Sequence, residues 1–197
     1  MIPVVFENEP SLFDVRIRQK GIAWCQRNNI SLNCPLPEGK KLKEYWRICL
    51  PAMRKIYHCF CAYTNILINP GEGTIDHFLP KNKYPKFAYE WTNYRLALPR
   101  INSRKKDCED VLDPFDIKDG WFQLDLITGF LYADPELPFQ KRTQILQTIN
   151  RLQLNDSMYK QYRLRYIDDY IHGKISIQLL ERDAPYIFRE MRRQNMF

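Results

Sequence analysis

The chain has 197 residues, a length that can bury a core without disulfides or metals. Its hydrophobic share of 45% and charged share of 27% exclude a disordered or fibrous protein. A formal net charge of +7 is compatible with nucleic acid or an anionic membrane surface as partner. We expect a cytoplasmic protein with reduced thiols, because the first residues lack the pattern of a secretory signal and the six cysteines are unevenly spaced.

The N-terminal segment, residues 1–58, is predicted to hold an extended arm and two packing helices, over 15–28 and 41–57, with Pro51 threatening a kink in the second. Apolar stretches on either side of a turn at 69–73 predict a hairpin or broad loop joining two strands, with residues 74–77 on the second. A short apolar segment, 91–98, and a polar, basic helix, 102–111, follow.

The C-terminal segment, residues 112–197, is expected to form one compact part. A hairpin is predicted over 121–132, turning at Thr128-Gly129, followed by helices over 138–154, 157–172 and from 176 towards the end, with Gly173 as a C-cap. The fold class is therefore α+β, with a small centre at 59–111 between helical flanks.

Positive charge is concentrated in the predicted centre. Between Phe78 and Lys106 there are eight basic residues and one acid, so that this segment carries +7 and the rest of the chain sums to zero. Such a local field is typical of a phosphate-binding surface, although a solvated basic face is the simpler alternative.

A carboxylate, an imidazole and two amides fall in or beside this segment: Asp76, His77, Asn93 and Asn102. Each also has an ordinary structural interpretation. His77 would be a core or capped histidine, Asn93 a turn residue, and Asn102 the N-cap of the following helix, with Ser103 as competitor.

The surrounding strings, at 74–81, 89–96 and 100–105, resemble those of HNH endonucleases in the His-Asn-Asn variant. The resemblance implies a ββα-metal motif in which Asp76 and Asn102 hold one Mg²⁺ or Mn²⁺. It makes His77 the general base and gives Asn93 the role of steadying the loop and orienting His77. Nucleic-acid contacts are expected from the basic residues Lys81, Lys83, Arg95, Arg100, Arg104, Lys105 and Lys106.

Many HNH proteins brace this motif with a zinc knuckle of two Cys-x-x-Cys pairs, and this chain departs from that pattern. Only Cys61 remains of the first pair, and Leu98 and Ile101 occupy the second. Structural zinc is therefore not expected, since a tetrahedral site needs four ligands. Burial of the two apolar residues would replace the missing brace.

The resemblance extends to the HNH components of Septu-type anti-phage systems, the PtuB family, through residues 1–5, 21–24, 46–51, 61–64 and 110–115. It implies a defence nuclease acting with an ABC-type, PtuA-like ATPase, sometimes within retron systems. Aromatic-rich 159–170 is a candidate docking patch, with core packing as the alternative.

Three alternatives stay open from the sequence. DNA is the expected substrate, but an RNA such as tRNA would present the same phosphates. A non-catalytic nucleic-acid-binding adaptor would keep the basic face, although the intact Asp76, His77 and Asn102 argue against it. A membrane-surface protein is disfavoured because the basic residues do not form one long amphipathic helix.

Overall fold

The computed structural model describes residue 1 and residues 3–197, and the chain has an α+β fold. It forms two compact units. The N-terminal unit comprises residues 6–61 and 68–109, and the C-terminal unit comprises 1–5, 62–67 and 110–197. Most of segments 1–58 and 59–111 thus falls in the N-terminal unit. The reason is aromatic packing across them, since the Phe13 and Tyr94 rings lie 5.8 Å apart and the Trp46 and His77 rings 4.7 Å apart.

Two helical segments open the N-terminal unit. A π-helical turn, Asp14–Arg18, runs into α1, Gln19–Arg27, as the predicted helix over 15–28 requires. The second helix is shorter than predicted. It begins as a 3₁₀ turn, Tyr45–Cys49, and continues as α2, Leu50–Ile56. Pro51 lies in the first turn of α2, where its missing N–H costs no hydrogen bond, and it therefore causes no kink.

The strands β1, Thr74–His77, and β2, Tyr94–Ala97, pair antiparallel, with Asp76 opposite Arg95 and His77 opposite Tyr94. The predicted placement of residues 74–77 on a strand is confirmed. The expectation of a first strand, joined to it by a hairpin or broad loop, is wrong, because no strand precedes β1 among residue 1 and residues 3–73. Positive φ angles at His58 (49°), Cys59 (61°) and Asn65 (56°) interrupt the extended backbone there.

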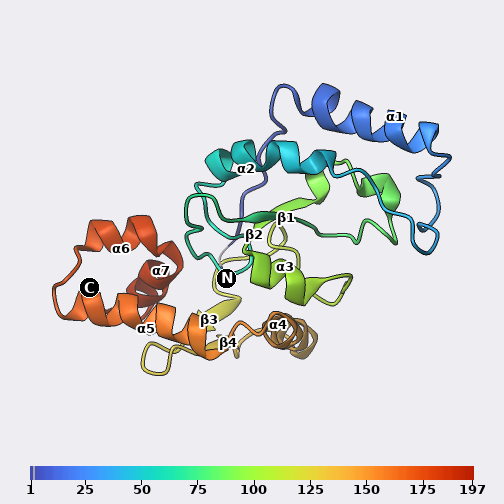
Figure 1. Ribbon diagram of the computed structural model, residues 1–197. Coiled ribbons are helices and arrows are strands. Elements are labelled where there is room, and N and C mark those ends of the chain that lie inside the picture. Colours follow the sequence, from blue (N-terminus) through green and yellow to red (C-terminus); the bar gives the residue numbers. More distant parts are fainter. Residues whose placement is uncertain (2) are drawn as a thin grey trace. The chain divides into compact units, whose positions relative to one another are not determined.

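The loop between the strands contains two 3₁₀ turns, Pro85–Phe87 and Trp91–Asn93. After β2, α3 runs over Pro99–Lys105 and begins earlier than the predicted 102–111, because Pro99 is suited to the first helical turn. α3 contacts β1 and α2 contacts β2, and Figure 1 shows the two helices on opposite sides of the strand pair. Ile101 is fully buried and Leu98 half-buried, which fits the expected apolar brace.

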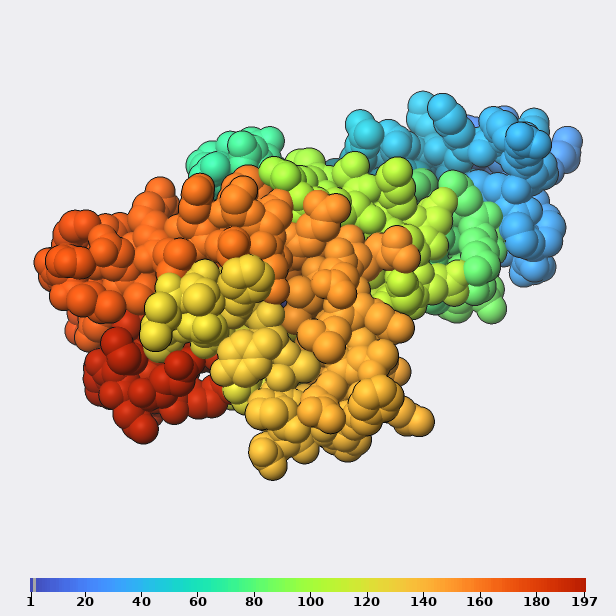
Figure 2. Space-filling view, turned by 90° about the horizontal axis from the view of Figure 1, so that it is seen from below, coloured from blue at the N-terminus to red at the C-terminus, as the bar shows by residue number. Residues whose placement is uncertain are grey.

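The C-terminal unit contains the predicted hairpin, formed by β3, Phe122–Leu124, and β4, Leu131–Ala133. Helices α4, Phe139–Leu152, and α5, Ser157–Ile171, also agree with prediction. The last predicted helix is two, α6, Ile177–Asp183, and α7, Pro185–Arg193, because Pro185 starts a new helix. Figure 2 shows the hairpin turn (yellow) at the surface beside α5 (orange), where the Arg163 guanidinium donates to the Gly129 carbonyl at 2.7 Å.

Among residue 1 and residues 3–197, the structure has no helix with both the length and the apolar character needed to cross a membrane.

Candidate functional site

A cleft of about 520 Å³ opens in the N-terminal unit over β1 and α3. Three of the four residues singled out in the sequence line it: Asp76, His77 and Asn102. The pairing of β1 with β2 and the packing of α3 on β1 bring together residues that are 25 positions apart in the chain. The fourth residue, Asn93, lies outside the lining and stabilises the loop behind it.

His77 ends β1 and is only 7% exposed. Its Nε2 lies 2.9 Å from the carbonyl oxygen of Ala88, which accepts but cannot donate, so Nε2 carries the proton and Nδ1 keeps its lone pair. The Trp46 and Tyr94 rings meet the imidazole edge-on, with centroids 4.7 and 5.1 Å away. These contacts fix both the tautomer and the orientation of the ring.

The imidazole is neutral at neutral pH. Burial is the main cause that lowers the pKa of His77, to about 3, and the cations of Lys81 and Lys105 lower it further, whereas the bond to Ala88 opposes the shift. The interpretation as a core histidine accounts for the burial. It does not account for the position of His77 on the cleft wall.

Asp76 is buried in the strand beside His77 and forms an ion pair with Lys105 of α3, with Nζ 3.2 Å from Oδ2. Lys105 is fully buried and also donates to the carbonyls of His77 and Phe78, at 3.0 and 2.9 Å. Its predicted role as a surface nucleic-acid contact is therefore wrong, because its ammonium faces the protein interior.

Asn102 lies inside α3 and donates from Nδ2 to Thr74 Oγ1 and to the Ile75 carbonyl, both at 3.3 Å. The N-cap interpretation is excluded, since the N-cap residue of α3 is Leu98. The two hydrogen bonds hold the amide of Asn102 against β1, on the cleft wall that also contains Asp76.

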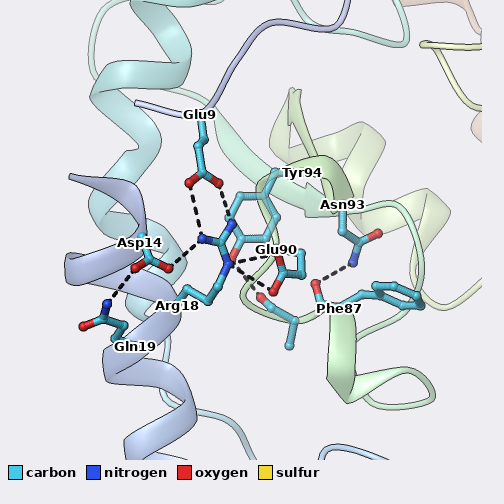
Figure 3. A network of polar contacts seen from close by, with 9 residues as sticks. Glu9, Asp14, Arg18, Gln19, Phe87, Glu90, Asn93 and Tyr94 are labelled. Atoms are coloured by element: carbon cyan, nitrogen blue, oxygen red, sulfur yellow. Dashed lines mark hydrogen bonds and ion pairs between the residues drawn. The ribbon is translucent and has the colours of Figure 1, made fainter. Parts of the chain in front are cut away.

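Asn93 ties the two ends of the loop between the strands. Its Oδ1 accepts from the Leu79 amide at 2.7 Å, and its Nδ2 donates to the carbonyls of Leu79 and Phe87 at 3.0 and 3.1 Å. Figure 3 shows the bond to Phe87, the residue before Ala88. Asn93 therefore acts on His77 indirectly, by fixing the backbone that supplies the carbonyl partner of the imidazole.

The donor set suits a hard divalent cation. Asp76 offers carboxylate oxygens and Asn102 an amide oxygen, the atoms that Mg²⁺ and Mn²⁺ prefer, and Mg²⁺ keeps several water ligands of its own. Within residue 1 and residues 3–197, no three His, Cys, Asp or Glu side chains gather as a metal site. A site with one carboxylate and one amide would be completed by water and phosphate oxygens.

The predicted basic residues separate in space. Lys81 and Lys106 line the cleft. On α3, Arg100 is exposed and Arg104 is half-buried. Lys83 is exposed but paired with Glu109. Arg95 is 3% exposed and donates to the carbonyls of Thr92 and Tyr94, so its predicted nucleic-acid contact is wrong.

Arg47 is a cleft cation that the sequence analysis missed. Its side chain is 73% exposed and pairs with Glu44 at 2.8 Å. Helical spacing could have predicted its exposure. Trp46 and Cys49 lie on the buried face, and Arg47 falls on the polar face between them.

The positions compared with a zinc knuckle in the sequence are joined by a direct contact. All six cysteines are free thiols, and the Cys61 Sγ accepts from the Leu98 amide at 3.4 Å, which joins the two places where knuckle ligands would stand.

An ion-pair network centred on Arg18 also supports the site and was not predicted from the sequence. Figure 3 shows Arg18 bound to Glu9, Asp14 and Glu90, the last at 3.0 Å, so that the helical opening anchors the loop just before Asn93.

No protein-family model and no curated protein sequence matches the chain.

Proposed function

We propose that the cleft over β1 and α3 is the active site of a metal-dependent endonuclease of the HNH type. The observation that carries the proposal is the geometry of His77. Its Nε2 is committed to the Ala88 carbonyl, which leaves the lone pair on Nδ1, and the imidazole lies on the wall of a cleft that also presents Asp76 and Asn102. A base with its lone pair at Nδ1 beside oxygen ligands for a cation is the equipment that phosphodiester hydrolysis requires.

In this mechanism His77 Nδ1 removes a proton from a water molecule. The water oxygen attacks phosphorus opposite the leaving 3′ oxygen, and the leaving oxygen gains a proton from solvent. Asp76 and Asn102 would hold one Mg²⁺ or Mn²⁺, which stabilises negative charge on the phosphate and the leaving oxygen when bound. Asn93 maintains the loop that orients His77.

The substrate we propose is DNA. Lys81, Arg47 and Lys106 place three cations around the cleft, where they can contact phosphates on either side of the scissile bond. Because phosphate contacts do not distinguish DNA from RNA, the substrate class is an outcome of the test below.

The wider sequence resemblance supports a role in a bacterial anti-phage system together with an ABC-type ATPase. We propose this partnership as the setting of the nuclease. Co-purification of the chain with a PtuA-like ATPase would support it, and failure of the two to associate at micromolar concentrations would contradict it.

Cleavage of plasmid DNA and of total tRNA, with Mg²⁺, Mn²⁺ or EDTA and with or without the ATPase, tests the function. Wild type should cleave with either metal and not with EDTA. Asp76→Asn should be inactive, because the carboxylate that holds the cation is lost. Asp119→Asn, which removes an equally charged but 73% exposed side chain of the C-terminal unit, should stay active. Full activity of Asp76→Asn would contradict the proposed active site, and a wild type that cleaves neither substrate under any of these conditions would favour an adaptor.

A further inference from the structure

Lys105 of α3 is a buried lysine that contacts Asp76, one of the two proposed cation ligands. Lys105 has no exposed surface, and its Nζ lies 3.3 and 3.2 Å from the two carboxylate oxygens of Asp76. The ammonium has three N–H donors, and it has three partners: this carboxylate and the carbonyls of His77 and Phe78. The side chain therefore cannot swing away without breaking all of these hydrogen bonds.

The charge of the cleft follows from this arrangement. Three acids line it (Glu44, Asp76 and Asp107), and three cations balance them (Arg47, Lys81 and Lys106). Lys105 lies behind the lining and adds one positive charge. A divalent cation that approaches Asp76 thus meets a carboxylate already neutralised by a fixed ammonium, in surroundings with no net negative charge.

We propose that Lys105 is the resident counter-ion of Asp76 and keeps cation affinity low until a substrate phosphate adds its own negative charge. Lys105 holds the buried carboxylate in place in the protein without metal, where its ammonium compensates the buried charge. The cation is then held firmly only in the ternary complex. This inference rests on the proposed function, and it assigns Lys105 a positioning and charge-balancing role.

Calorimetric titration with Mn²⁺, without nucleic acid, tests the proposal. Lys105→Met keeps the length of the side chain and removes the charge, and we expect it to bind Mn²⁺ about tenfold more tightly than wild type or better. Lys106→Met is the matched control, since it removes the same charge from the exposed neighbour, and its affinity should change by less than about threefold. A Lys105→Met variant that binds Mn²⁺ no more tightly than Lys106→Met would overturn the proposal.

Metal-linked stability gives a second measurement in case Lys105→Met folds poorly. Without metal this variant should have a lower Tm than wild type, and Mn²⁺ should raise its Tm by more than that of wild type, because binding to the native state stabilises it. The double variant Asp76→Asn/Lys105→Met has no buried charge to compensate and should fold without responding to Mn²⁺. If Lys105→Met and the double variant are both unfolded whatever the Mn²⁺ concentration, Lys105 is needed for packing alone and the proposal is overturned.

A third titration separates the two hypotheses. In the His77→Ala background, which prevents cleavage, DNA should tighten Mn²⁺ binding by the protein that retains Lys105. If that protein binds Mn²⁺ only with DNA but Lys105→Met is no tighter without it, the role of Lys105 is refuted and the proposed function stands. If neither binds Mn²⁺ with or without DNA, both fail.

Discussion

At the scale of single residues, one hydrogen bond and burial make His77 chemically different from a surface histidine. The Ala88 carbonyl fixes its tautomer at 2.9 Å, and its burial disfavours the charged form. The sequence indicated a base at this position through the Asp-His pair. It did not reveal the carbonyl partner, because a backbone group has no signature in the sequence.

The depressed pKa of His77 makes stability depend on pH. Between the unfolded value of about 6.5 and the folded value of about 3, the unfolded chain binds a proton at this residue that the folded protein does not, so stability falls as pH falls through that window. His77 should contribute about 1.4 kcal/mol per pH unit to this loss. Urea unfolding of wild type and His77→Gln at pH 7, 5.5 and 4.5 measures it, and parallel pH profiles for the two proteins would refute the assignment.

Asn93 should matter for stability as well as activity. Asn93→Ala removes three hydrogen bonds and leaves the partly buried N–H and C=O of Leu79 without the side chain that pairs them, which should cost about 2–4 kcal/mol. Asn69→Ala is the control, because Asn69 bonds only within an exposed turn, and it should change stability by less than about 0.5 kcal/mol. Denaturant unfolding compares them, and equal effects would show that Asn93 is not the tie of the loop.

At the scale of elements, the helical opening of the N-terminal unit packs directly on the loop that holds Asn93. Gly21 of α1 faces the Tyr89 ring so closely that an added Cβ would lie 2.4 Å from its carbon atoms. Helix propensity alone recommends alanine at position 21, since glycine costs a helix about 1 kcal/mol. The close approach explains why glycine stands there.

Gly21→Ala should therefore destabilise the protein despite its better helix propensity, by about 1–3 kcal/mol, because the ring has to move. A thermal unfolding curve measures the change. A higher Tm for the variant would mean that α1 does not pack on Tyr89 as described.

Arg18→Met should loosen the same junction. Arg18 joins Glu9, Asp14 and Glu90, and a network of this kind, partly shielded from solvent, should be worth about 1–2 kcal/mol. A double-mutant cycle with Glu90→Gln isolates the link to the loop, and additive effects of the two substitutions would show that this link carries no energy.

Much of the element order was predictable, and the exceptions have physical causes. The motif spacing located β1 and the loop asparagine, and helical periodicity located α1, α4 and α5. The start of α3 was misplaced because Asn102 is a good capping residue, and its tertiary bonds to Thr74 and Ile75 were not visible in the sequence. The missing first strand reflects left-handed residues, His58 and Cys59, that are not glycines.

At the scale of the whole molecule, the basic residues that cluster between Phe78 and Lys106 divide into a buried set and an exposed set. Arg95 and Lys105 point inward and satisfy buried carbonyls and a carboxylate, whereas Lys81 and Lys106 reach the cleft. Linear charge density predicted a basic surface. It could not separate the two sets, because burial depends on strand pairing and helix packing.

Nucleic-acid binding should depend on the exposed set and not on the buried Arg95 and Lys105. Lys81→Ala and Lys106→Ala should each weaken binding and flatten the log–log salt dependence by about one unit, since each removes one phosphate contact. Lys118→Ala, an exposed cation of the C-terminal unit, should leave the slope unchanged. Fluorescence anisotropy between low and physiological salt measures these slopes. Unchanged slopes for both cleft variants would place the binding surface elsewhere.

The most direct test of the nuclease assignment is single-turnover cleavage of prebound DNA by wild type, His77→Ala and the matched control His172→Ala. The side chain of His172 is 62% exposed on the C-terminal unit. We predict that all three proteins bind DNA equally, that wild type and His172→Ala cleave it with Mn²⁺, and that His77→Ala does not. Cleavage by His77→Ala at the wild-type rate would contradict the role of His77 as general base and, with it, the account of the cleft.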